Sequence, residues 1–534
     1  MNLALPIWRS PIRNLVTLLA ASILAILHQY LFYGHIPGIS VPIFVLFFYG
    51  FMLMFAGDRL VPYTKFNGLL SLVIVMLSFS YVLFDQFFFH FLNLLVLPIL
   101  IAIHLTMWMG YQTRDWFQKG IIYDTLLHVI PRNFRHFPTA FSSVTSSISE
   151  KMAEGTRKTV LKIFIGVAIS APLLVLVITL LSSADGLFEA FLGSIPNWLN
   201  QITYSEGFFR LTWVFIFTLL FFGYVTGFVK PESQKEQIMN SFSKEDDLNE
   251  VEKGSISADR VPLHSENVCN SKNEEIEPKT LLLDPVISAT VLVLINIVYI
   301  IFIALQFSYL FGAWEGALPE GITYADYARK GFAELMLVAL LNFTILMTVL
   351  LHTAESSPIV RRINRFMTYL LVLSSLIILY SAYSRLHLYE EAYGFTHIRF
   401  LVHVFMLFLA VLMIIAGLWI HNKRIPLAKC YIILGLIAYV IVNYAGMDSY
   451  IAEKNIERYH LTGVLDEPFL TSLSADAVPI LIEFSDEYPQ MNDHLKGLYQ
   501  ELTGQEKAWP SFNMAEYKAR QAIIKHLSAQ SSVK

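Results

Sequence analysis

The sequence predicts an all-α, polytopic integral membrane protein: a bundle of about eleven transmembrane helices with a small helical C-terminal domain. Hydrophobic residues make up 55% of the 534 residues and charged residues only 15%, well below the roughly 25% of soluble domains. The mean hydropathy is +0.55. The apolar residues are gathered into long runs, and lipid can cover such surfaces whereas water cannot.

Eleven runs approach the roughly 20 apolar residues that cross a bilayer. The first follows Arg9 and Arg13, but it is too long for the core of a signal peptide and no small-residue cleavage site follows. We therefore interpret it as an uncleaved first span. The runs are 15–33, 41–56, 67–84, 88–109, 163–182, 209–228, 285–311, 332–351, 366–384, 399–420 and 429–446.

The Lys and Arg residues predict the orientation. If the N-terminus is cytoplasmic, the cytoplasmic segments carry 25 of these residues and the outer loops carry 4. Positive charge is retained on the cytoplasmic side, so this bias favours an N-terminus inside. An odd number of spans then places residues 447–534 outside. The predicted location is a cell membrane, crossed many times, with the lipid bilayer as the first partner.

Composition divides the chain into four predicted regions. Residues 1–228 form an N-terminal membrane half of six spans with a basic cytoplasmic loop at 110–162. Residues 229–283 form a polar cytoplasmic linker with 12 acidic and 7 basic residues, a composition typical of disorder. Residues 284–446 hold five spans. Residues 447–534 form an extracytoplasmic helical tail, with helices after Asp448, around Ser474 and Pro479, and from Trp509 to Leu527.

Several classes of function are disfavoured. The net charge of −4 argues against a nucleic-acid partner. Two cysteines, Cys269 and Cys430, predict neither a disulfide framework nor a cysteine metal site. The common metalloprotease, phosphate-loop, nucleophile-elbow and CxxC patterns do not occur. We therefore predict no metal, no cofactor and no catalytic residue. Asp85, in the short turn between the third and fourth spans, is expected to be a solvated turn residue.

A polar cluster is predicted at the outer ends of the last four spans. Glu334 begins a span there, and an ionisable residue at a membrane boundary is costly unless it is paired. Gly394 fits a helix stop and Thr396 fits the N-cap of the tenth span. Arg399 then falls in a first helical turn, where the helix dipole disfavours a cation, so it should have an acidic partner such as Glu334, Glu390 or Asp326. The candidate residues are Asp326, Tyr327, Arg329, Glu334, Arg385, Tyr389, Glu390, Tyr393, Arg399, Asn443, Asp448, Asn455 and Arg458.

Two interpretations of this cluster stay open. It is either a binding site roofed by the tail, or a structural network of ion pairs that holds the short loops and the tail in place.

Three stretches carry a family resemblance: YARKGFAEL ending at Leu335, SRLHLYEEAYGFTHIRF at 384–400, and NYAGMDSYIAEKNIERY from Asn443 with GVLDEPFLTSLSADAVP after it. They resemble a bacterial family of multi-pass membrane proteins, domain of unknown function 4173, whose sister is 4153. The resemblance covers the chain from about residue 280 onward. It implies a bacterial membrane protein without an established activity, and it assigns no catalytic residue.

Three functions are compatible with these features. The first is a non-enzymatic envelope sensor or scaffold, in which the outer site and the tail bind a ligand or a membrane or envelope protein. The second is a transporter of a small or lipidic substrate, although few charges fall at the middle of the spans. The third is a membrane transferase that uses a lipid-linked substrate, with Arg399 and Lys330 gripping a phosphate.

Overall fold

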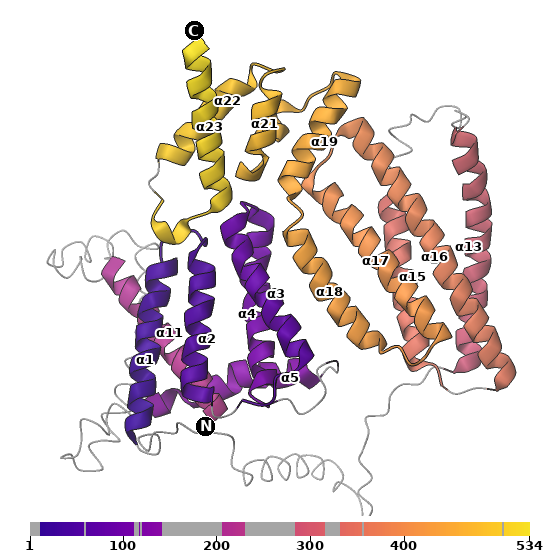
Figure 1. Ribbon diagram of the computed structural model, residues 1–534. Coiled ribbons are helices and arrows are strands. Elements are labelled where there is room, and N and C mark those ends of the chain that lie inside the picture. Colours follow the sequence, from indigo (N-terminus) through magenta and orange to yellow (C-terminus); the bar gives the residue numbers. More distant parts are fainter. Residues whose placement is uncertain are drawn as a thin grey trace, which may run out of the picture. The chain divides into compact units, whose positions relative to one another are not determined.

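The computed structural model describes residues 11–57, 60–111, 117, 120–140, 206–229, 284–314, 332–354, 357–504 and 507–533. All regular elements in these residues are helical (Figure 1). Ten long helices lie in the positions of ten predicted spans. They are α1 (Pro11–Phe32), α2 (Ser40–Ala56), α3 (Lys65–Leu83), α4 (Phe87–Trp108), α11 (Glu206–Val229), α13 (Pro285–Trp314), α15 (Phe332–His352), α16 (Pro358–Tyr393), α17 (His397–His421) and α18 (Leu427–Asn443).

These helices make the chain a multi-pass membrane protein, as predicted. Eight of the described helices are long and apolar enough to cross a bilayer, and α18 joins them when it is taken together with the bent helix that follows. The remaining one, α2, is apolar but has only 17 residues. The predicted span 163–182 and the linker after Val229 lie outside the described residues.

The chain forms two compact units, and each is described by itself. The first combines residues 1–229, 383–415 and 423–534, and the second combines residues 230–382 and 416–422. The two long helices α16 and α17 contribute to both units. The predicted boundaries of the four regions stay a prediction.

Helix α11 packs closely against α1 and against a short segment that follows α4. That segment consists of α5 (Gly120–Leu127), a π-helical turn (His128–Arg132) and α6 (Asn133–Arg135). A Cβ atom on Gly223 of α11 would lie 2.6 Å from the backbone oxygen of Asn133. A Cβ on Gly227 would lie 3.1 Å from the His128 ring. The two glycines, one helical turn apart, therefore allow the close approach, as small residues do between membrane helices.

Helix α18 is fastened to α3 and α4 by a buried polar network. The side chain of Asn93 donates to Asn443 Oδ1 at 2.7 Å and to Ser80 Oγ at 3.2 Å. Tyr439 donates to Asn93 Oδ1 at 2.6 Å. Asn93 is fully buried and Asn443 almost so. Because these amides satisfy one another, they act as polar links between spans.

The second unit uses similar links. Asn296 of α13 donates to the backbone oxygen of Met367 at 2.9 Å, and Asn364 donates to the backbone oxygen of Pro285 at 3.0 Å. Tyr299 donates to Asn342 of α15. Much of the remaining surface of these helices carries exposed apolar side chains, as lipid contact requires.

The tail domain, residues 447–533, is helical, as predicted. It contains α19 (Met447–Thr462), α20 (Glu467–Thr471), a 3₁₀ turn (Ala475–Ala477), α21 (Val478–Phe484), α22 (Met491–Gly504) and α23 (Met514–Val533). Its core includes Ile451, Leu470, Leu481, Leu495 and Ile523, all at most 1% exposed.

The last tail helix begins later than predicted. Trp509–Ser511 forms a separate 3₁₀ turn. Asn513 Oδ1 then accepts from the backbone N–H groups of Ala515 and Glu516, so α23 starts at Met514. Helix α22 was not predicted.

Candidate functional site

The bend between α18 and α19 places a carboxylate where the tail meets the membrane helices. The two helices differ in direction by 61°, and Gly446 at the bend has a φ of +60°, which glycine adopts without strain. Asp448 follows in the first turn of α19, where the helix dipole favours a negative charge. Asp448 is only 5% exposed.

Asp448 is held by two hydrogen bonds from different segments. His397 Nε2, from the first turn of α17, donates to Asp448 Oδ1 at 2.7 Å. The backbone N–H of Ser474 donates to Oδ2 at 3.1 Å. Burial by itself would raise the pKa of Asp448, but the hydrogen bonds from His397 and Ser474 outweigh it, so the pKa is lowered. This carboxylate therefore stays charged and fixes three segments together.

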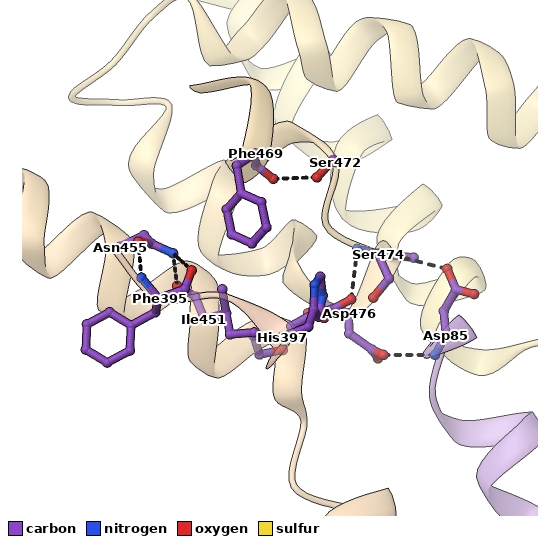
Figure 2. Close-up of polar contacts among 12 residues, drawn as sticks. Asp85, Phe395, His397, Ile451, Asn455, Phe469, Ser472, Ser474 and Asp476 are labelled. Carbon is purple, nitrogen blue, oxygen red and sulfur yellow. Dashed lines mark hydrogen bonds and ion pairs between the residues drawn. The ribbon is translucent and has the colours of Figure 1, made fainter. Parts of the chain in front are cut away.

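A second contact joins the tail to the turn between α3 and α4 (Figure 2). The backbone N–H of Asp85 donates to Asp476 Oδ2 at 2.8 Å. In return, the backbone N–H of Ala475 donates to Asp85 Oδ2 at 3.3 Å. Both carboxylates are half-buried. We call Asp85, His397, Asp448, Ser474 and Asp476 the aspartate junction.

The paired carboxylates at this junction disfavour charge on each other. Burial, together with repulsion from the carboxylates of Asp85 and Asp448, raises the pKa of Asp476 to about 7, although the N–H of Asp85 opposes the shift. Burial also raises the pKa of Asp85, against the effects of the Ala475 N–H and of Lys507. The aspartate junction thus contains one firmly ionised carboxylate and two that hold protons more tightly than usual.

The tail also contacts the turn between α1 and α2. The backbone N–H of Ile39 donates to the oxygen of Phe512 at 3.1 Å. A Cβ on Gly38 would lie 2.6 Å from that same oxygen, so only glycine fits. Trp509 donates to the Tyr30 hydroxyl at 3.0 Å.

Asn513 completes the attachment by donating to the backbone oxygens at positions 81 and 84, at 3.1 and 2.7 Å. In Figure 1 the tail helices accordingly lie over the adjoining ends of α1 to α4.

A different carboxylate lies at the end of α16, on the same side of the helices as the tail. Glu390 is 1% exposed, and neither of its carboxylate oxygens has a hydrogen-bond partner among the described residues. His403 Nδ1 of α17 lies 3.3 Å from Glu390 Oε2. The ring of Tyr383 lies against that of His403, with centroids 4.4 Å apart. We call this the Glu390–His403 pair.

The loop between α16 and α17 is held by side chains from α19. Asn455 accepts from the Phe395 N–H and donates to the Phe395 oxygen, each at 2.9 Å (Figure 2). Arg458 donates to the oxygens of Glu391 and Ala392, at 2.9 and 2.7 Å. These bonds satisfy the exposed carbonyls at the end of α16, as a helix C-terminus requires.

Arg399 is engaged within the same loop. It donates to the oxygen of Gly394 and lies 4.3 Å from the centre of the Tyr389 ring. Its positive charge also acts on Glu390. Gly394 has a φ of +86°, and a Cβ there would lie 2.8 Å from Asn455 Oδ1. The predicted helix stop at Gly394 is therefore where α16 ends.

Comparison with known proteins places the chain in a family. A family model described as "Domain of unknown function (DUF4153)" matches residues 71–484, which is more than half of the chain. The chain belongs to the DUF4153 family. No curated protein and no solved structure gives a significant match.

The family match corrects two predictions. The chain belongs to the sister of the family that its outer stretches resemble. The match also starts near the beginning of α3, about 200 residues before the predicted start. The N-terminal spans offered only hydropathy, which cannot separate one membrane family from another. The DUF4153 match includes the whole aspartate junction and the Glu390–His403 pair, and it ends with α21.

The structure of this DUF4153 protein brings some predicted site residues together and leaves others apart. Those around the end of α16 lie close to one another: Tyr389, Glu390, Tyr393, Arg399, Asn455 and Arg458. Arg385, one turn before Tyr389, is partly exposed. Asp448 belongs to the aspartate junction instead, and Asn443 to the network between spans.

The stretch before α15 remains untested. Glu334 is an exposed residue in the first turn of α15, within the second unit. Asp326, Tyr327 and Arg329 lie outside the described residues. No group of three or more metal-ligating side chains occurs in the part of the chain that the structure describes.

Four residues were missed by sequence reasoning: Asp85, His397, His403 and Asp476. Asp85 is not simply a solvated turn residue, because it bonds to a segment about 390 positions away. No local pattern signals such a partner. A weak signal existed for the two histidines. His397 lies just before the start of the predicted span 399–420 and His403 just after it, and polar residues at a membrane boundary need partners.

Proposed function

We propose that this DUF4153 protein is a non-enzymatic membrane sensor or scaffold whose tail domain binds an envelope partner or ligand while seated on α1 to α4. The observation that supports it is the aspartate junction, where the tail and the α3–α4 turn exchange hydrogen bonds through two carboxylates that disfavour each other's charge. The hydrogen bonds favour a docked tail, whereas repulsion between the two carboxylates favours its release.

The tail has the attributes of a module that could respond as a unit. It has its own hydrophobic core, and its polar attachments come mainly from the α1–α2 and α3–α4 turns and from the α16–α17 region. Its core also continues onto Phe89 of α4 and Phe395. An event at the tail surface would therefore reach the ends of α4 and α17 through direct contacts.

In-membrane photo-crosslinking tests this proposal. A photoreactive residue would replace Leu461 or Val464, which are 82% and 57% exposed on the tail. The matched control replaces Ile437, which is 41% exposed on α18. We expect a discrete adduct, reproducible in mass, from the tail positions and not from the control. Adducts at the tail that match the control in pattern and yield would contradict the proposal.

Transport of a small or lipidic substrate is the second candidate, and the Glu390–His403 pair favours it. A buried carboxylate without hydrogen-bond donors at a membrane boundary is costly, and such residues often mark a transport path. Uptake into proteoliposomes that Glu390→Gln abolishes would support transport, whereas equal uptake by both proteins would remove Glu390 from any path.

A further inference from the structure

The Asp85–Asp476 contact joins two parts of the molecule that are far apart in sequence. Asp85 belongs to the turn between α3 and α4, and Asp476 to the 3₁₀ turn of the tail. Each carboxylate accepts a backbone N–H from the opposite segment, at 2.8 and 3.3 Å. The tail is therefore seated partly through two acidic side chains, each of which is hydrogen-bonded to the backbone of the opposite segment.

We propose that the aspartate junction is a proton-controlled seat: the tail docks with a proton on one of the two carboxyl groups of Asp85 and Asp476, and loss of that proton loosens the tail. This inference rests on the proposed function and names its stimulus. The geometry carries it, because the reciprocal backbone hydrogen bonds hold two half-buried carboxylates beside the same contact. Two such carboxylates repel each other when both are charged, and separating the tail from the turn relieves this repulsion.

The surrounding charges do not cancel the repulsion. Asp448 and Glu501 add negative charge near Asp85, and Lys507 opposes them. Lys507 also pairs with Glu516 at 2.6 Å, which reduces its effect. His397 directs its Nε2 to Asp448. The seat therefore contains more acidic than basic groups.

A buried amide lies beside the pair in sequence. Gln86, which follows Asp85, is 2% exposed, and neither polar atom of its side chain has a hydrogen-bond partner among the described residues. Gln86 is therefore a buried polar residue that directly follows the Asp85 N–H bonded to Asp476.

The direction of the pH effect follows from the raised pKa values. In the docked state the pKa of Asp476 is raised to about 7, whereas a released, solvated aspartate has a pKa near its ordinary 3.8. The docked state therefore binds more protons between these two limits, so docking weakens as the pH rises through this window. Each pH unit inside it changes the docked-to-released ratio by up to about tenfold for one proton.

Asp448 contributes in the opposite direction but outside this window. Its lowered pKa stabilises the docked state above pH 3.8, and this contribution is lost only at still lower pH. Between pH 5 and 8 the Asp85–Asp476 pair alone sets the predicted response of the junction carboxylates.

Pulsed electron spin resonance on the full chain in lipid nanodiscs tests the seat. Spin labels would occupy Ile36, 63% exposed in the α1–α2 turn, and Leu461 on the tail, with Cys269 and Cys430 replaced by serine. We expect a single distance at pH 5 and a growing second population with a longer distance by pH 8, with the ratio changing at least about tenfold.

Three variants make the test decisive. Asp476→Asn and Asp85→Asn each remove one of the two charges that repel each other, so each should stay docked at both pH values. Asp493→Asn, at an exposed tail aspartate with a side chain 85% exposed, should respond like the unmodified chain. Distances that do not change with pH in the unmodified chain would overturn the inference, as would release of both junction variants at pH 5.

A further measurement asks whether the ligand of the seat is a proton or a metal ion. The tail is released at pH 8 and 1–5 mM Ca²⁺ is added, roughly an extracellular concentration. Redocking on addition of Ca²⁺ would overturn the proton as the ligand. A negative result in all of these measurements would leave the photo-crosslinking test of the sensor or scaffold unaffected.

Discussion

Two histidine–carboxylate pairs on one helix have opposite surroundings. His397 and His403 both belong to α17, six residues apart, and each lies beside a buried carboxylate. Asp448 accepts hydrogen bonds from His397 and from the Ser474 N–H, whereas Glu390 has none among the described residues and lies 3.3 Å from His403. The first pair fixes structure. The second pair lacks hydrogen-bond donors, an arrangement that costs free energy whenever the buried carboxyl group is charged.

This contrast teaches that the residue types do not decide the role. The deciding quantity is how many donors reach the carboxylate, and that depends on segments far away in the sequence. Replacing each carboxylate by its amide therefore gives a matched test of the two pairs.

Asp448→Asn should have the largest effect. The amide nitrogen would face either the Ser474 N–H or the His397 Nε2–H, so one of these partly buried donors loses its acceptor. We expect the free energy of unfolding to fall by about 3 kcal/mol. Denaturant titration in mild detergent would measure it, with Asp493→Asn as the control. A loss below about 0.5 kcal/mol would place Asp448 among ordinary surface charges.

Asn455→Ala should have an intermediate effect. Asn455 satisfies both backbone groups of Phe395, and this loop starts the helix that carries both histidines. We expect a loss of about 2 kcal/mol and faster proteolysis between α16 and α17. Unchanged cleavage would show that the loop is held by Arg458 alone.

Glu390→Gln should have the smallest effect on stability and can be slightly stabilising. A neutral amide of equal size removes a buried charge that lacks donors, so we expect a change between zero and a gain of about 1 kcal/mol. The same denaturant titration would check it. A loss as large as that of Asp448→Asn would erase the distinction between the two pairs.

The sequence predicted the membrane fold because apolar runs report directly on lipid contact. It also predicted the end of α16, since Gly394 is followed by a helix start near Thr396. It could not predict the aspartate junction, because the partners of Asp85 and Asp448 are set by three-dimensional packing. Arg399 illustrates the same limit: its charge acts on Glu390, one of the predicted partners, but its hydrogen bond goes to a backbone oxygen that no charge pattern indicates.

The seating of the tail on the N-terminal spans is the central claim, and a cysteine pair tests it most directly. Tyr30→Cys and Trp509→Cys replace two side chains that are hydrogen-bonded at 3.0 Å, in a chain without Cys269 and Cys430. A short bifunctional thiol reagent applied to native membranes should join them rapidly, and more slowly when Asp448→Asn is added. A rate no higher than that of the control pair, Tyr30→Cys with Leu461→Cys, would contradict the claim.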